Sequence, residues 1–295
     1  MSFPRLQTER RRAPERAAPD RRGLRKGVYL IPSVFTALNL FAGFYSLMST
    51  MSGFRQLGIG GAANIQQATI HFDYAAMAIG WALLCDILDG RIARMTKSTT
   101  EIGIQLDSIA DVVSFGLAPA VLAYVWGYGT SLESFTNVGQ LPWFLSFMYL
   151  ICGGFRLARF NVQASRPRLI AEGTPKVDKQ SFVGLPIPVA GGMIAAIVHF
   201  APEPIKYAPQ HVQLYAGLMM ALIGLLSVLM VSTMRFTSLK GVGTGSRNTR
   251  LVLGVIALAG LIYLYSRWVL LILVTTYVVH GLGSRLVNSL RRRPA

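Results

Sequence analysis

One stretch of this sequence decides the fold, residues 86–116, DILDGRIARMTKSTTEIGIQLDSIADVVSFG. It contains Asp86, Asp89, Asp107 and Asp111, although the whole chain has only 13 acidic residues. Apolar segments lie on both sides, each close to the roughly 20 residues that a membrane-spanning helix needs. Because an ionised carboxylate is costly to bury in an apolar medium, four of them at such a junction indicate a functional site.

The composition of the 295-residue chain is that of an integral membrane protein. It is 52% hydrophobic and only 14% charged, with a mean hydropathy of +0.45, a combination that is rare in soluble domains. We expect an all-α membrane fold with six spans, near 28–50, 72–93, 106–127, 140–162, 181–201 and 213–234. Two shorter segments, near 251–266 and 268–283, are expected to bring the total to eight spans or to form a helical hairpin.

The distribution of the formal net charge of +16 indicates how the chain is oriented in the membrane. If the chain begins in the cytoplasm and crosses eight times, all 29 Lys and Arg residues lie on the cytoplasmic side except Arg55, Lys206 and Arg267. This asymmetry follows the positive-inside rule and adds attraction to anionic lipids. It predicts a multi-pass protein of the cell inner membrane, with both termini and the aspartates cytoplasmic. Nucleic-acid binding is not expected, because the Arg-rich tail has no aromatic interleaving.

Three regions are predicted. Residues 1–27 form a basic cytoplasmic tail that ends in an interfacial helix and does not resemble a signal peptide. Residues 28–240 form the main membrane domain, and residues 241–295 form a C-terminal helical pair with a basic tail. Cys85 and Cys152 fall inside apolar helices, where packing is a better explanation than a disulfide.

The aspartates are spaced so that each pair shares one helix face. Asp86 and Asp89 are three residues apart at the end of the second span, and Asp107 and Asp111 are four apart at the start of the third. A short connection makes these helices antiparallel neighbours, so the four carboxylates can converge at one depth. Oxygen ligands without His or Cys suit hard cations such as Mg²⁺, Mn²⁺ or Ca²⁺. Four carboxylates suffice for a two-metal site that clamps a phosphate.

Two other interpretations of the aspartates stay open at this point. They can be interfacial carboxylates paired with the nearby Arg91, Arg94 and Lys97, or they can line a pathway for divalent cations. A transport pathway is disfavoured because all four lie at one membrane face. Gly90 and Gly103 favour a binding site, since glycine lets a bulky ligand or a second helix approach the backbone closely.

The pattern also matches a known family. The segment reads D-x-x-D-G-x-x-A-R, then eight residues, then G-x-x-x-D-x-x-x-D. At every position it resembles the signature of the CDP-alcohol phosphatidyltransferases, which identifies residues 28–240 as that domain. The resemblance implies a core of six spans, a homodimer, and a binuclear metal site at the cytoplasmic membrane face. It also implies a reaction in which an alcohol displaces CMP from a CDP-linked lipid.

The resemblance further implies roles for individual residues. Asp86, Asp89 and Asp107 would be metal ligands, while Asp111 would contact the second metal and act as general base. Two Mg²⁺ or Mn²⁺ ions are the implied cofactors, with Ca²⁺ as an inhibitory substitute. Contacts to CDP-diacylglycerol are expected from Pro32, Thr36, Asn39, Gly90, Arg94 and Thr100.

Three further stretches concern the acceptor alcohol, RLARFN (156–161), SFVGLPIPVAGG (181–192) and STMRFTSLK (232–240). With IPSVFTALNLFAGF (31–44), they are similar to the subgroup that uses L-serine and produces phosphatidylserine. Arginine can bind the serine carboxylate through paired donors. The candidate serine-binding residues are Arg156, Arg159, Asn161, Arg235 and Lys240.

Alternatives remain for these stretches as well. The arginines can simply anchor a helix end at the headgroups, and the basic residues of 232–240 can be topology signals. The prolines of GLPIP exclude a plain helix and predict either irregular backbone lining a cavity or a helix that starts at one of them. Glycerol 3-phosphate or inositol phosphate is the alternative acceptor, although its phosphate should need a denser basic cluster.

Overall fold

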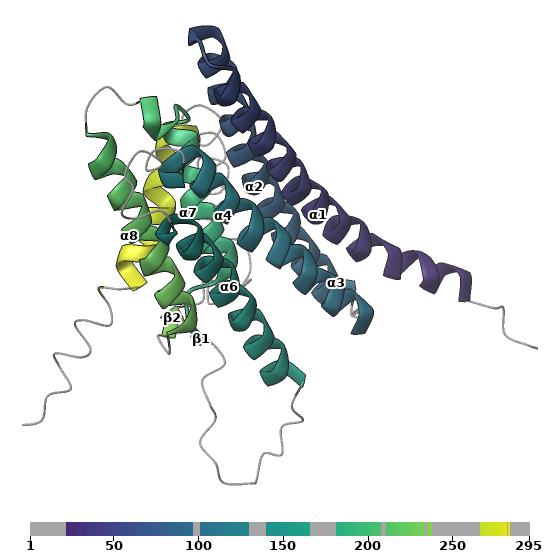
Figure 1. Cartoon of the computed structure of the whole chain (residues 1–295). Coiled ribbons are helices and arrows are strands. Elements are labelled where there is room, and N and C mark those ends of the chain that lie inside the picture. Colours follow the sequence, from purple (N-terminus) through teal and green to yellow (C-terminus); the bar gives the residue numbers. More distant parts are fainter. Residues whose placement is uncertain are drawn as a thin grey trace, which may run out of the picture.

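The computed structural model describes residues 22–96, 101–129, 140–165, 181–207, 211–232, 235–237, 266–281 and 283. Two long helices, α1 (Arg22–Ile59) and α2 (Ala62–Thr96), form an antiparallel pair on one side of the bundle (Figure 1). Gly60 and Gly61 join them, with φ of 75° and 89°, values that favour glycine. This tight turn brings the α1 residues Thr36 and Asn39 beside the aspartate end of α2.

The third long helix contains two wider turns. It runs through α3 (Glu101–Asp111), the π-helix η1 (Val112–Leu117), α4 (Ala118–Leu122) and the π-helix η2 (Ala123–Tyr128). Pro119 lacks the N–H that would bond to the Phe115 carbonyl one turn earlier. The Tyr149 hydroxyl donates to that carbonyl instead, at 3.0 Å. Pro119 therefore accounts for the missing α-helical hydrogen bond at this turn, and the Tyr149 hydroxyl supplies a donor to the same carbonyl.

The remaining elements complete the bundle. The longer helices are α6 (Leu141–Ser165), α7 (Ile187–Phe200) and α8 (Val212–Val231), with the short 3-10 helix η3 (Ile205–Tyr207) between the last two. Two short strands, β1 (Ser181–Val183) and β2 (Arg235–Thr237), pair antiparallel. A further helix, Ser266–Gly281, is called the C-terminal helix below.

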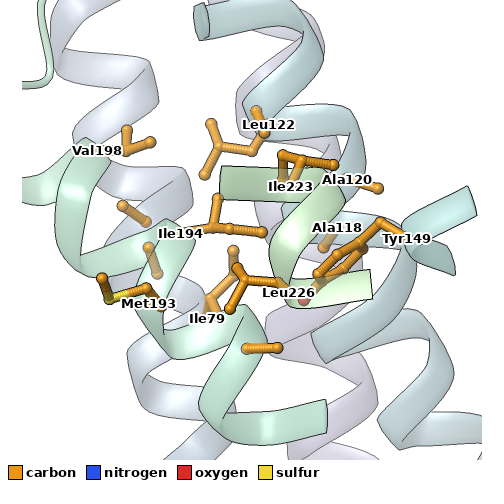
Figure 2. Close-up of a cluster of buried hydrophobic side chains, with 14 of the residues drawn as sticks. Ile79, Ala118, Ala120, Leu122, Tyr149, Met193, Ile194, Val198, Ile223 and Leu226 are labelled. Atoms are coloured by element: carbon orange, nitrogen blue, oxygen red, sulfur yellow. The ribbon is translucent and has the colours of Figure 1, made fainter. Parts of the chain in front are cut away.

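Side chains from five helices fill the centre of the bundle (Figure 2). Ile79 of α2, Leu122 of α4, Tyr149 of α6, Ile194 of α7 and Ile223 of α8 are all fully buried. Alanines add to one face of α2, and such small residues let membrane helices approach closely and gain dispersion contacts. This packed centre fixes the ends of α2 and α3 that carry the aspartates.

The segment before α7 corrects one predicted boundary. A span was expected to begin at residue 181, but the chain forms β1 there and α7 begins only at Ile187, with Pro186 as its N-cap. Gly184 has φ of 84°, and a Cβ at this position would clash with the Met230 carbonyl oxygen. Of the two arrangements predicted for GLPIP, the structure has the helix that starts at a proline, preceded by a non-helical turn at Gly184 where the chain passes too close to the end of α8 for a side chain.

The structure supports a multi-pass membrane protein. Among the residues that the structure describes, four helical stretches are long and apolar enough to span a membrane, Val34–Ile59, Ile102–Tyr128, Leu141–Val162 and Val212–Val231. Residues 22–27, where the interfacial helix was expected, are helical and form the first turns of α1. The predicted span 251–266 lies almost wholly outside the described residues, and the C-terminal helix occupies most of 268–283.

Candidate active site

Three aspartates converge from two helices. One carboxylate oxygen each from Asp86 of α2 and from Asp107 and Asp111 of α3 lies within 4.8 Å of the others. Asp111 is buried, whereas Asp86 and Asp107 are partly exposed. The convergence that their spacing predicted is present, although residues 97–100 separate α2 from α3 in the sequence.

The fourth aspartate is bound by α1. Asp89 is buried, and its Oδ2 accepts a hydrogen bond from the Thr36 hydroxyl. Asp107 lies within electrostatic range of both Asp86 and Asp89. Asp89 therefore adds negative charge near the cluster of three aspartates and is held there by α1.

One face of α1 packs closely against the aspartate cluster. Asn39 Nδ2 donates to Asp111 Oδ1 at 3.3 Å, and Ser114 Oγ of η1 donates to the Asn39 carbonyl at 2.9 Å. Gly43, one turn further along α1, allows this close crossing, because a Cβ there would lie 2.7 Å from Ser114 Cα. Thr36, Asn39 and Gly43 thus align α1 with the aspartates, and a side chain at position 43 would separate the helices.

The cluster fits hard divalent cations. Several carboxylates in a poorly solvated volume repel one another strongly unless cations lie between them. The ligands are all oxygens, as Mg²⁺ and Mn²⁺ prefer. Asn39 Oδ1 is buried and has no hydrogen-bond partner among the residues that the structure describes, so one more oxygen faces the site. The arrangement can hold metal ions and, through them, a phosphate.

A guanidinium borders the cluster on the side of α6. Arg156 lies within electrostatic range of Asp111 and is repelled by Arg159, one turn along the same helix. Its Nε atom is buried and has no hydrogen-bond partner within the described part of the chain. Asn161 Nδ2 donates to Ser108 Oγ of α3 at 2.8 Å. Among the expected serine-binding residues, Arg156 is therefore one whose charge acts on an aspartate of the cluster.

The other predicted residues have less detailed placements. Gly90 follows Asp89 in α2. Pro32 and Arg94 lie in helices and Arg235 in β2, and only their backbones are described, while Thr100 and Lys240 are outside the described residues. Strand pairing sets Val183 opposite Arg235. The motifs at 181–192 and 232–240 are therefore neighbours in space, which their separation in the sequence did not predict.

A polar cluster at the opposite end of the bundle was not predicted. His199 Nδ1 of α7 lies 2.5 Å from Asp73 Oδ1 of α2, and His199 Nε2 lies 2.9 Å from Ser266 Oγ. Arg267 Nη2 approaches Asp73 Oδ2 at 3.8 Å. The available signal for this contact was that the predicted spans 72–93, 181–201 and 268–283 each have one end at this side of the membrane.

The bundle and its acidic site are those of a membrane enzyme acting on a phosphate-linked substrate. The chain belongs to the CDP-alcohol phosphatidyltransferase family, whose pattern matches residues 29–229.

Several curated relatives named CDP-diacylglycerol–serine O-phosphatidyltransferase are similar to it. One from Helicobacter pylori (strain ATCC 700392 / 26695) is 30% identical over 256 residues, 86% of this chain and 90% of the relative. One from Saccharomyces cerevisiae (strain ATCC 204508 / S288c) is 34% identical over 56% of this chain and 51% of the relative. One from Bacillus subtilis (strain 168) is 34% identical over 45% of this chain and 64% of the relative.

Proposed function

We propose that this protein transfers the phosphatidyl group of CDP-diacylglycerol to L-serine, producing phosphatidylserine and CMP. The observation that carries the proposal is the similarity over 90% of a relative named for this reaction. The site supports it, because the charge of Arg156 acts on Asp111, a member of the carboxylate cluster. Glycerol 3-phosphate and inositol phosphate are less favoured, since none of the similar relatives above is named for them.

Four carboxylates would hold two divalent cations in this reaction, Asp86, Asp89, Asp107 and Asp111. Bound Mg²⁺ or Mn²⁺ would neutralise the pyrophosphate and stabilise the charge on the departing phosphate. Ca²⁺ should bind the same oxygens but support the reaction poorly, because it prefers more ligands at longer distances. Thr36 restrains one of these carboxylates and Asn39 another.

Asp111 is proposed to accept the proton of the serine hydroxyl. The serine oxygen then bonds to the phosphorus that carries diacylglycerol, and the bond from that phosphorus to the CMP oxygen breaks. Serine's hydroxyl is a poor nucleophile until a base takes its proton. Asn39 restrains the Asp111 carboxylate, which supports a fixed direction for proton transfer.

Substrate binding is assigned to the residues around this centre. The CDP-diacylglycerol contacts are proposed for Pro32, Thr36, Asn39, Gly90, Arg94 and Thr100. Arg156 would bind the serine carboxylate, with Arg159 and Asn161 on the same helix end and Arg235 and Lys240 as further contacts. The placement of Arg156 beside Asp111 supports this most directly, because it sets a cation next to the base that meets the serine hydroxyl.

A CMP-release assay with a panel of acceptors tests the proposed function. Purified protein with CDP-diacylglycerol and Mg²⁺ or Mn²⁺ should release CMP with L-serine and form phosphatidylserine. Glycerol 3-phosphate, inositol phosphate and ethanolamine should give little CMP, since none offers a carboxylate beside a hydroxyl. Release with one of these acceptors and none with serine would overturn the serine assignment while leaving the family's chemistry intact.

The membrane orientation and the assembly are part of the same proposal. The charge distribution supports eight spans in the inner membrane, with the aspartate site and both termini cytoplasmic. The family resemblance supports a homodimer, which the mass of the detergent-solubilised protein measured by light scattering would test.

Cysteine labelling tests the orientation. In a background with Cys85 and Cys152 replaced by serine, we expect Ile102→Cys and Ala63→Cys to lie on opposite sides of the membrane. Ile102 is 82% exposed near the site, and Ala63 is exposed beside the α1–α2 turn. A reagent that does not cross membranes should label Ala63→Cys in right-side-out vesicles and Ile102→Cys only in inverted ones. Labelling of both from one side would exclude this arrangement.

A further inference from the structure

A hydrogen bond between two side chains joins α3 to α6 beside the aspartates. Asn161 Nδ2 of α6 donates to Ser108 Oγ of α3 at 2.8 Å, and Ser108 Oγ in turn donates to the Ile104 carbonyl at 2.9 Å. The hydroxyl proton therefore points along α3 itself, which leaves an oxygen lone pair to accept from Asn161. Because Ser108 and Asn161 are 53 positions apart in the chain, this bond fixes one helix against another.

The aspartate end of α3 is held from two sides. The helix packs on α1, while α6 packs on η1, the turn that follows α3. From α1, Asn39 Nδ2 donates to Asp111 Oδ1 at 3.3 Å, and from α6, Asn161 donates to Ser108. On the outer side of α3, Ile109 is 57% exposed. Two asparagine amides on different helices thus restrain how far α3 can turn about its own axis.

The rotation of α3 decides where its two carboxylates lie. Ser108 follows Asp107 directly and precedes Asp111 by three residues, which sets it about 60° around the helix axis from Asp111. A carboxylate at the helix surface is roughly 5–6 Å from the axis, so a turn of about 10° moves it by about 1 Å. That displacement exceeds the roughly 0.5 Å within which a functional constellation must be held, and Mg²⁺ demands near-ideal octahedral geometry.

We propose that Ser108 is a positioning residue of the metal site, and that Asn161 acts on the site through Ser108. Their hydrogen bond sets the rotation of α3 at which the carboxylates of Asp107 and Asp111 converge with that of Asp86. This inference rests on the proposed metal site and does not depend on which alcohol is the acceptor. The role is separate from the acceptor contact proposed for Asn161, and the two are distinguished by measuring metal binding without substrates.

Ser108→Ala tests this role, because it removes the hydroxyl that Asn161 meets and leaves every carboxylate in place. Binding of Mn²⁺ alone to the detergent-solubilised full chain, followed by electron paramagnetic resonance of the free ion, should weaken about tenfold or more, the range for residues that orient metal ligands. Asn161→Ala should weaken it to a similar extent. The double variant should bind no more weakly than either single variant, because both changes remove the same bond. Ser108→Thr keeps a hydroxyl and should keep near wild-type affinity.

Ser52→Ala is the matched control. Ser52 Oγ donates to the Met48 carbonyl one turn back at 2.9 Å, as Ser108 does to Ile104, but in α1. It lies roughly 20 Å along that helix from Asn39, at about 1.5 Å per residue, so its replacement should leave Mn²⁺ affinity unchanged. A purely structural role of Ser108 would lower the unfolding midpoint without changing the Mn²⁺ affinity of the folded protein.

Unchanged Mn²⁺ affinity in Ser108→Ala or in Asn161→Ala would overturn the proposal, and so would additive losses in the double variant. A raised KM for serine in Asn161→Ala with wild-type Mn²⁺ affinity would leave Asn161 only its acceptor contact. If Ser108→Ala does not fold, Asn161→Ala, which leaves α3 unaltered, decides the question by the same measurement. Wild-type Mn²⁺ binding is measured first. Its absence would end the proposed metal site as well, whereas unchanged affinity in the variants concerns Ser108 and Asn161 alone.

Discussion

Asp111→Asn is expected to release CMP roughly 10²–10⁴ times more slowly than the wild type while still binding CDP-diacylglycerol, the usual loss for a positioned acid–base group. Three carboxylates remain for the cations, so the pyrophosphate keeps most of its partners. The loss should appear mainly in kcat, as it does for an interaction made in the transition state. Rapid-quench measurement of CMP together with CDP-lipid binding checks both parts.

Asp107→Asn is the control, because it changes the same group one helical turn away. Asp107 interacts with the two α2 carboxylates, Asp86 and Asp89, whereas Asp111 also meets the Asn39 amide and Arg156. We therefore expect Asp107→Asn to lose metal affinity and CDP-lipid binding together. Equal loss of binding in both variants would make Asp111 mainly a metal ligand. Near wild-type turnover of Asp111→Asn would remove it as the base.

Removing divalent metal should abolish CMP release completely, and Mg²⁺ or Mn²⁺ should restore it. The physical reason is the placement of three carboxylate oxygens within 4.8 Å of one another, which leaves the site strongly repulsive to an anionic pyrophosphate when no cation is present. Ca²⁺ should compete with Mg²⁺ and restore little activity. The assay compares chelated protein with protein supplied with each metal in turn.

A second measurement separates metal binding from catalysis. Ligands that bind only the folded state stabilise it, so added Mn²⁺ should raise the thermal unfolding midpoint of the wild type. The rise should be smaller in Asp107→Asn, which has one carboxylate fewer. Full turnover by chelated protein, or equal midpoint shifts in the two proteins, would contradict the proposed binuclear site.

The aspartate site could be predicted from the sequence because it depends on residues that are close together in the chain. Spacings of three and four residues fix which helix face each pair occupies, and a short connection forces the two helices together. The convergence of Asp86, Asp107 and Asp111 follows from those facts alone. The irregular backbone at GLPIP was predictable for a similar reason, since proline removes a donor whatever surrounds it.

Contacts between distant helices carried no such local signal. Nothing near Ser266 in the sequence marks it as a partner of His199, 67 residues earlier, because this contact depends on how the C-terminal helix packs against α7. The start of α7 was placed too early because hydrophobicity does not distinguish β1 from a helical turn. The interfacial helix expected at the end of residues 1–27 stays a prediction; the structure shows residues 22–27 as the first turns of α1.

The polar contact between His199 and Ser266 has a consequence for how the protein is made. The two residues are 67 positions apart in the chain, which at about 5–20 residues per second takes roughly 3–13 s to synthesise. Throughout that interval the nascent chain holds Asp73 and His199 in the membrane without the hydroxyl that later joins them. The polar cluster can therefore close only after Ser266 has been synthesised, later than the helices that carry the aspartates.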